Sequence, residues 1–358
     1  MRAALIRSNL CDKGKVSQAT ESGGLSRLSV LDQSPIPEGL TGGDALRNTI
    51  DLARLADELG YHRYWLAEHH GTPGLACASP EVVIGPVAAA TQRIRVGTGG
   101  VMLPHYSPLK VAETFSMLSG LYPGRIDLGL GRAPGTSATV AHALQRDRRQ
   151  PAPDDFPEQL DELLGYFAHR KQQAGPFRQI PAMHFESPEP WLLGSSPQSA
   201  VWAAEFGLPY AFADFINPAG ESYAAYYREH FQPSERLAEP RVAVAVWAVC
   251  AETGDEALRL SASSRMMMLH LYRGKLIAVP PMERALRFLE EEGVPMQMLP
   301  PNRRMITGDP DEVRRAIERV AADYRAEEAL VVNILYEHAA RRRSYELIAR
   351  AFGLTRRP

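Results

Sequence analysis

The chain has 358 residues, of which 45% are hydrophobic and 23% are charged, and its formal net charge is -2 at pH 7. These are ordinary globular values, and a nearly neutral chain gives no reason to expect nucleic acid or an anionic membrane as a partner. Three cysteines without pairing or metal-ligand spacing are typical of a reducing compartment. No run approaches the roughly 20 apolar residues of a membrane span, and the N-terminus lacks a signal-peptide pattern, so we expect a soluble, cytoplasmic protein.

The first part of the chain alternates short apolar runs with amphipathic ones. Residues 1–26 are polar and show no periodicity, so a poorly ordered N-terminal tail is expected there. Runs of β-branched and apolar residues predict strands, and apolar residues at helical spacing predict the helices between them. The elements predicted up to residue 130 are strands over 27–31, 64–67, 94–103 and 125–130 and helices over 44–59, 80–90 and 109–119.

The rest of the chain continues this alternation after one long interruption. Residues 136–157 are irregular and rich in Arg, Pro and Asp, and a connection of that length is often a lid or a small subdomain. The elements predicted beyond it are strands over 190–194, 209–214, 242–250 and 329–336 and helices over 160–169, 195–206, 222–231, 255–269, 282–292, 310–324 and 344–352. Eight strands, each followed by helical material and without a linker, favour one α/β domain over 27–358. The fold class predicted is a (β/α)8 TIM barrel with insertions at its C-terminal face.

Glycines interrupt or end two neighbouring strands. The third strand breaks at Gly97-Thr98-Gly99-Gly100, and the fourth runs into Gly131-Arg132. In a parallel α/β protein, ligands bind at the C-terminal strand ends. Gly99, Gly100 and Gly131 have no side chains to keep a flat ring away, although a packing bulge would also explain glycine there.

Glu68-His69-His70 follows the second strand, at the face where catalytic residues of a barrel gather. A structural cluster that ties down a loop is one interpretation. A metal site is a weak one, because neighbouring side chains on an extended chain point to opposite faces. A single histidine, His69, acting as general base or hydrogen-bond partner is more consistent with the pattern.

The run Gly194-Ser195-Ser196-Pro197-Gln198-Ser199 lies where the fifth strand passes into a helix. Free backbone N–H groups and the helix dipole make such a junction suitable for a phosphate. The hydroxyls of Ser195, Ser196 and Ser199 are further candidate donors, and Arg132 is a candidate clamp. Ordinary capping of the helix by serine is the alternative.

These motifs together resemble the bacterial luciferase-like flavin monooxygenases. The resemblance is carried by EHH at 68–70, RVGTGGV at 95–101, GLGRAPG at 129–135 and WLLGSSPQS at 191–199, and it extends from about Leu28 to Asp214 and more loosely to Phe352. It implies a barrel that binds FMN, receives it reduced from a separate flavin reductase, and uses O2 to oxygenate a small organic substrate.

The same resemblance assigns roles to individual residues. It implies that His69 is catalytic and that Thr98, Gly99 and Gly100 form a strand bulge, with a non-prolyl cis peptide bond, against the flavin ring. Gly131 would lie beside the ring, and the flavin phosphate would contact Arg132 and the loop of Gly194, Ser195, Ser196 and Ser199. Light-emitting relatives have cysteine where this chain has Gly131 and glutamate where it has Ser195, which argues against light emission.

Three other functions remain open at this stage. One is a deazaflavin-dependent oxidoreductase of the same superfamily that transfers hydride, the second is a non-catalytic flavin-binding protein, and the third is a metal-dependent barrel hydrolase. We also expect a homodimer or higher homo-oligomer, because the helices over 49–59 and 82–90 have more apolar positions than one buried stripe needs. Relatives pair through the corresponding helices. Residues 136–157 and 268–300 are the candidate lids.

Overall fold

The eight predicted strands occur and close into a parallel barrel. The computed structural model describes residues 24–133, 136–145, 148–150, 154–168, 186–299 and 303–355. Each barrel strand pairs in parallel with the next, and β10 closes the ring by pairing with both β1 and β8. The barrel strands in order are β1 (Arg27–Asp32), β2 (Arg63–Leu66), β3 (Arg95–Thr98), β5 (Ile126–Gly131), β6 (Glu189–Gly194), β7 (Tyr210–Ala213), β8 (Val242–Cys250) and β10 (Glu328–Val332). The predicted (β/α)8 barrel is confirmed.

Two short strands extend the sheet beyond the barrel. The predicted third strand is interrupted at Gly99–Gly100, whose peptide bond is cis, and its second part is β4 (Val101–Met102), which pairs with β5. The other addition, β9 (Ile306–Gly308), pairs with the end of β8. The sequence analysis did not predict β9, because three residues are too short to show a period.

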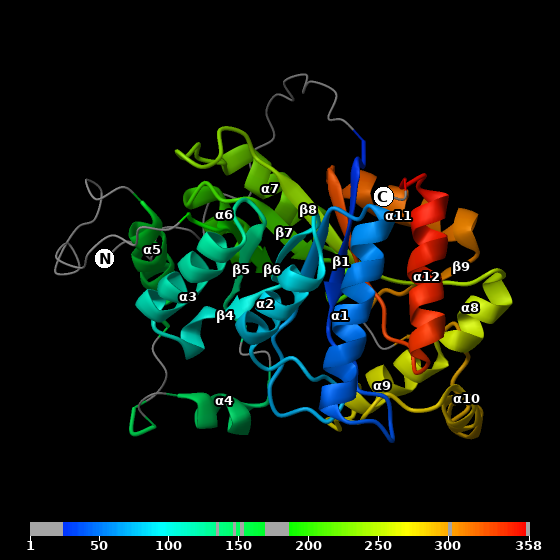
Figure 1. Cartoon of the computed structure of the whole chain (residues 1–358). Coiled ribbons are helices and arrows are strands. Elements are labelled where there is room, and N and C mark those ends of the chain that lie inside the picture. The colour runs from blue at the N-terminus through cyan, green and yellow to red at the C-terminus, as the bar shows by residue number, and fades with distance from the viewer. Residues whose placement is uncertain are drawn as a thin grey trace, which may run out of the picture.

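Helices surround the barrel and also cover part of its C-terminal end (Figure 1). They are α1 (Gly42–Leu59), α2 (Pro80–Ala90), α3 (Pro108–Leu121), α4 (Ala138–Leu144), α5 (Phe156–Phe167), α6 (Pro197–Glu205), α7 (Glu221–His230), α8 (Gly254–Leu260), α9 (Ala262–Tyr272), α10 (Met282–Glu291), α11 (Pro310–Asp323) and α12 (His338–Ala351), with a 3₁₀ turn at Leu103–His105. Among these described elements, no helix has the length and apolar character needed to cross a membrane.

Two helix predictions are corrected. The segment predicted as irregular contains α4, whose N-cap hydroxyl on Ser137 accepts a hydrogen bond from the Val140 N–H. The single helix predicted over 255–269 is two helices, α8 and α9, which meet at Ser261. Its hydroxyl donates to the Leu258 carbonyl, and such a local bond competes with the helical hydrogen-bond pattern. Most of the predicted tail, and the end of the predicted helix over 160–169, lie outside the described residues.

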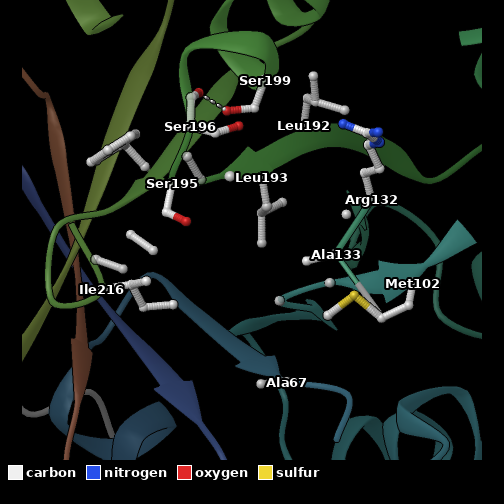
Figure 2. Close-up of a pocket in the computed structure, with 18 of the residues that line it drawn as sticks. Ala67, Met102, Arg132, Ala133, Leu192, Leu193, Ser195, Ser196, Ser199 and Ile216 are labelled. Atoms are coloured by element: carbon white, nitrogen blue, oxygen red, sulfur yellow. Dashed lines mark hydrogen bonds between the residues drawn. The ribbon is translucent and has the colours of Figure 1, made fainter. Parts of the chain in front are cut away.

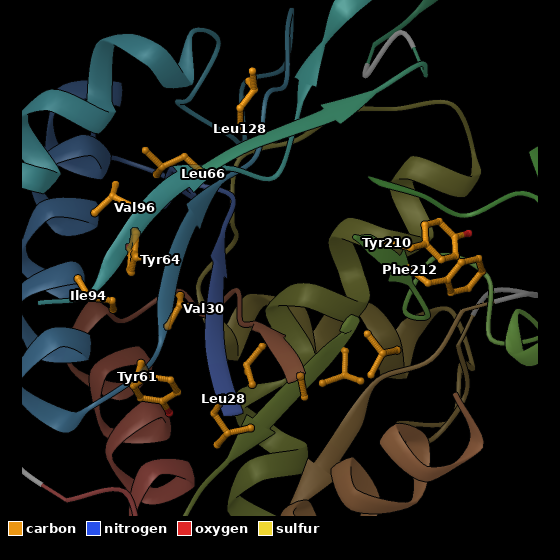
Figure 3. Close-up of a cluster of buried hydrophobic side chains, with 14 of the residues drawn as sticks. Leu28, Val30, Tyr61, Tyr64, Leu66, Ile94, Val96, Leu128, Tyr210 and Phe212 are labelled. Carbon is orange, nitrogen blue, oxygen red and sulfur yellow. The ribbon is translucent and has the colours of Figure 1, made fainter. Parts of the chain in front are cut away.

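Side chains alternate between two cores along each strand. Outward residues such as Val30, Tyr64, Val96 and Leu128 pack in the layer between the barrel and its helices (Figure 3). Inward residues such as Leu31 form a second cluster inside the barrel. This alternation is what the period of two in a strand requires.

Buried charges fill the N-terminal end of the barrel interior. The fully buried guanidinium of Arg63 pairs with Asp127 at 2.8 Å and with Glu328 at 3.0 Å. Arg95 pairs with Asp127 at 2.5 Å, and Arg241 pairs with Glu189 beside them. Burial alone raises the pKa of Asp127, but the Arg63 and Arg95 guanidinium groups outweigh burial and hold that pKa below its ordinary value.

Removing Arg63 should therefore destabilise the protein strongly. We expect Arg63→Met to lower the free energy of unfolding by about 3–5 kcal/mol, because Glu328 then remains buried without its cation. Urea unfolding measures the change. The control is Arg47→Met, which removes the exposed Arg47–Asp44 pair and should cost less than about 1 kcal/mol. Equal losses for the two variants would contradict the role given to Arg63.

Candidate active site

A cavity of about 730 Å³ lies within the C-terminal half of the barrel. It exists because inward positions at this level are small: Ala67, Gly99, Gly131, Ala213 and Ala245 all line it. Larger inward side chains fill the barrel below, where Trp65 and Trp191 meet edge to face with their ring centres 5.3 Å apart. The volume of the cavity lies within the range found for small-molecule and cofactor sites.

One end of the cavity is formed by the turn between β6 and α6 (Figure 2). Gly194 is required there, because a Cβ atom would lie 2.2 Å from the hydroxyl of Ser199. That hydroxyl is already bonded: it lies 2.6 Å from the Ser196 carbonyl and 2.9 Å from the Tyr210 hydroxyl. Since a hydroxyl has one proton, Ser199 donates to the carbonyl and accepts from Tyr210. Ser199 therefore lines the cavity but mainly fixes the shape of the turn.

The hydroxyls of the two preceding serines, Ser195 and Ser196, make no hydrogen bond to any residue that the structure describes. Ser196 is the N-cap residue of α6, yet its side chain makes no capping hydrogen bond. Ser195 also lines the cavity, and its carbonyl accepts a hydrogen bond from the Asn217 side chain at 3.0 Å, which ties the turn to the loop after β7. The capping alternative does not account for these hydroxyls. Together with the N-terminus of α6, they present uncharged donors of the kind that suits an anion.

Arg132 supplies positive charge at the same end of the cavity (Figure 2). It follows β5 directly, and its guanidinium lies 2.8 Å from the Asp154 carboxylate and 5.5 Å from the centre of the Trp202 ring. The side chains of Arg132 and Asp154 are 48% and 76% exposed, so this ion pair is held weakly. We call Ser195, Ser196, Arg132 and the N-terminus of α6 the anion pole.

The glycines of the neighbouring strands line the cavity for different reasons. A Cβ atom on Gly100 would lie 2.7 Å from the Gly129 backbone, so packing alone requires glycine there, whereas one on Gly99 would lie 2.3 Å from a terminal methyl group of Leu31 and would force that side chain to shift. A Cβ atom on Gly131 would meet nothing nearer than the Met102 sulfur at 3.4 Å. Packing therefore does not require glycine at position 131, and the missing side chain leaves open space in the cavity. Thr98 does not line the cavity, because its buried hydroxyl donates to the Gly129 carbonyl at 2.8 Å.

Glu68 organises the segment that follows β2. This fully buried carboxylate lies 2.7 Å from His70 Nε2, accepts from the Tyr106 hydroxyl at 2.9 Å, and accepts from the Met102 N–H at 3.1 Å. It thereby connects the end of β2 to the chain just beyond the Gly99–Gly100 bond. His70 is thus committed to a structural contact.

His69 faces the cavity instead. Its backbone N–H donates to the Cys77 carbonyl at 2.9 Å, while its Nδ1 has no hydrogen-bond partner among the described residues. Burial, followed by the neighbouring His70, lowers the pKa of His69 to about 4 despite an opposing effect of the Ala67 backbone. The imidazole is therefore neutral at pH 7 and can accept a proton or donate one hydrogen bond.

Some cavity residues were not predicted. Gln33, Trp202, Phe215 and Asp154 all line the cavity. Gln33 lies two residues beyond the end of the strand predicted over 27–31 and directly follows the observed β1, and that position near a strand end was the only available signal. In the part of the chain that the structure describes, no cluster of three or more His, Cys, Asp or Glu side chains is arranged to hold a metal ion.

Comparisons with known proteins agree with this architecture. The family model of luciferase-like monooxygenases matches residues 26–328. A protein of Escherichia coli strain K12 named luciferase-like monooxygenase is 40% identical over 325 residues, which cover 89% of this chain and 95% of that protein. The N-acetyl-S-alkylcysteine monooxygenase of Bacillus subtilis strain 168 is 37% identical over 334 residues, which cover 91% of this chain and 98% of the relative. The crystal structure of apo-MsnO8 is 42% identical and superposes with a TM-score of 0.84 over 93% of this chain and all of the other.

Proposed function

The chain belongs to the luciferase-like monooxygenase family, and we propose that it uses reduced FMN from a separate flavin reductase, with O2, to oxygenate a small organic substrate. One observation carries the proposal: a single cavity joins an anion pole to a neutral, inward-facing histidine, His69. The anion pole suits a phosphate, and His69 suits proton transfer near a reacting group.

The residues of the anion pole fit the FMN phosphate. Two free serine hydroxyls, the N-terminus of α6 and the Arg132 guanidinium are donors of the type that phosphates bind. Gly99, Gly100 and Gly131 line the adjoining wall, and Gly131 has the space to accept a flat ring. When bound, reduced FMN would supply the electrons with which O2 is activated.

The remaining cavity residues would control water and protons. Leu31, Ala211, Phe215 and Leu330 give the cavity an apolar lining that excludes water from the reacting groups. His69, neutral at pH 7, would hold or transfer a proton at its imidazole nitrogens. Glu68 and His70 would keep the segment of His69 in place through their 2.7 Å contact.

Thioethers are the first substrate candidates that we propose. One relative, 37% identical to this chain, is named for the oxygenation of an S-alkylcysteine derivative, and the apolar lining of the cavity suits an uncharged sulfide. Consumption of O2 with formation of a sulfoxide would support the proposal. Reduction of a deazaflavin cofactor without O2 uptake would instead identify a hydride-transfer enzyme, and binding of FMN without either reaction would identify a flavin-binding protein.

Arg132 should contribute directly to FMN binding. We expect Arg132→Ala to weaken FMN binding by about 1.5–3 kcal/mol, the scale of a hydrogen bond to a charged group. Riboflavin, which has no phosphate, should bind both proteins alike. Asp154→Asn removes the present partner of Arg132 and should strengthen FMN binding. Fluorescence titration measures all three effects, and an unchanged FMN affinity in Arg132→Ala would exclude this phosphate site.

The two histidines should behave differently when substituted. We expect His69→Ala to bind FMN almost normally but to lose 10²–10⁴-fold in oxygenation rate, the scale for a positioned acid–base group, and to release hydrogen peroxide instead. His70→Ala should mainly destabilise the fold by about 1–3 kcal/mol, because it removes a partner of the buried Glu68. Peroxide yield and flavin reoxidation are followed after mixing with O2. A normal peroxide yield in His69→Ala beside a raised yield in His70→Ala would reverse the assignment.

We also propose a homodimer that pairs through α2 and α3. Val82 on α2 and Met117 and Leu121 on α3 are 68%, 56% and 69% exposed, the two helices are in contact, and exposed large apolar side chains favour a partner. Sedimentation at micromolar concentration should give a mass above the 39.5 kDa of one chain. Leu121→Lys should shift the protein toward monomer, whereas Leu271→Lys, at an exposed position on α9, should not. A monomeric wild-type protein would contradict the proposal.

A further inference from the structure

The cavity has a charged end and an uncharged wall across from it. The charged side chains that line it, within the described part of the chain, are Arg132 and Asp154, and they pair with each other at the anion pole. In the order of the barrel strands, β1 and β6 are separated by three strands in either direction, so their ends lie opposite each other. The wall opposite the anion pole is therefore built by the ends of β1 and β2.

This wall presents two polar side chains, Gln33 after β1 and His69 after β2. Gln33 shares the inward face of Leu31, whereas Asp32 between them points outward and bonds Thr49 at 2.8 Å. The other side chains of the wall, Leu31, Trp65 and Ala67, are largely apolar. His69 is neutral at pH 7 because its pKa is about 4. A substrate at this wall thus meets no formal charge from its described residues.

The carboxamide of Gln33 is half-buried and makes no hydrogen bond within the described residues. A carboxamide has two donor hydrogens and one acceptor oxygen. Its N–H groups can donate to the oxygen of an amide or of another carbonyl compound, and its oxygen can accept from the N–H of an amide. Gln33 is only partly buried, and an uncharged polar group of a ligand can replace water as the hydrogen-bond partner of its carboxamide. A carboxylate would instead lose its water without gaining a cation.

We infer that Gln33 is a specificity-determining residue and that the substrate is an uncharged molecule with an apolar body and one carbonyl or amide group. The apolar body contacts Phe215, Ile216 and Leu330, which line the cavity beyond this wall. The polar group contacts Gln33, next to His69. This inference rests on the proposed function, because it requires FMN to occupy the anion pole and leave this wall to the substrate.

Binding to the full chain saturated with oxidised FMN tests the inference without turnover. Three matched thioethers serve as probes in calorimetric titrations at pH 7.5: 3-(benzylthio)propanamide, the corresponding propanoic acid, and benzyl propyl sulfide. We expect the amide to bind at least roughly tenfold more tightly than the acid. Gln33→Leu should weaken amide binding roughly 3- to 10-fold, the range of one neutral hydrogen bond, and should change sulfide binding less than about twofold.

The control variant is Gln92→Leu, at an exposed glutamine outside the cavity lining, which should change none of the three affinities. FMN affinity and thermal unfolding of Gln33→Leu should equal those of the wild type, which shows that the cavity is intact. If FMN binds but the acid binds as tightly as the amide, or if Gln33→Leu weakens all three probes equally, the inference is overturned while the proposed function stands. If FMN itself does not bind, the proposed function fails, and the inference fails with it.

Discussion

The barrel can be hollow at one end because ion pairs close it at the other. Main-chain pairing sets the register of the strands, but a cavity at the C-terminal end leaves few side-chain contacts across the barrel there, so such contacts must come from the other end. Arg63 on β2 does this by binding Asp127 on β5 and Glu328 on β10, and Trp65 donates to Asp127 at 2.9 Å just above. One buried guanidinium thus connects three strands that lie far apart in the sequence. The ion pairs are costly to break and none of their residues lines the cavity, which begins above them at Trp65, so the lining residues can be small or polar without loosening the barrel.

A second buried carboxylate, Glu68, holds together the strand ends that form the candidate active site. Loops at strand ends are otherwise the most mobile parts of a barrel. Glu68 accepts a backbone hydrogen bond from Met102 and contacts both His70 and Tyr106, which fixes the ends of β2 and β4 relative to each other. His69 and the Gly99–Gly100 bond are therefore held on adjoining parts of the cavity wall. In the proposed function, His69 transfers a proton and the wall at Gly99–Gly100 holds the flavin ring. Their relative positions must then be fixed, because small displacements reduce catalysis sharply.

Much of this architecture could be predicted from the sequence, because strand patterns are local. The apolar run over 242–250 and the glycine breaks near 97–100 and 131 identify strands and their ends without any tertiary information. Glu68, His69 and His70 could be placed at the cavity face, but the sequence alone does not show that Glu68 binds His70 and leaves the Nδ1 atom of His69 without a partner among the described residues. Gln33 and Asp154 could not be assigned to the cavity, since neither belongs to a recognisable motif and their positions depend on how distant segments meet. The break between α8 and α9 falls at Ser261, whose hydroxyl donates to the Leu258 carbonyl and accepts from Arg265, and no periodicity shows such contacts.

The proposed use of FMN as a substrate, rather than as a permanently bound group, places an upper limit on useful affinity. A flavin that arrives reduced and leaves oxidised must dissociate within the catalytic cycle, and the phosphate has the same charge in both redox states.

The cation at the anion pole already has a partner: Asp154 binds Arg132 at 2.8 Å, and both side chains are substantially exposed. A phosphate must compete with this carboxylate for the guanidinium, and the negative charge of Asp154 opposes the phosphate directly. The uncharged donors of the pole are free of such competition, because the Ser195 and Ser196 hydroxyls and the N-terminus of α6 carry no opposing charge. If FMN binds as proposed, the phosphate meets fixed neutral donors together with a cation whose charge its own neighbour reduces, and that balance would favour exchange of the flavin over retention.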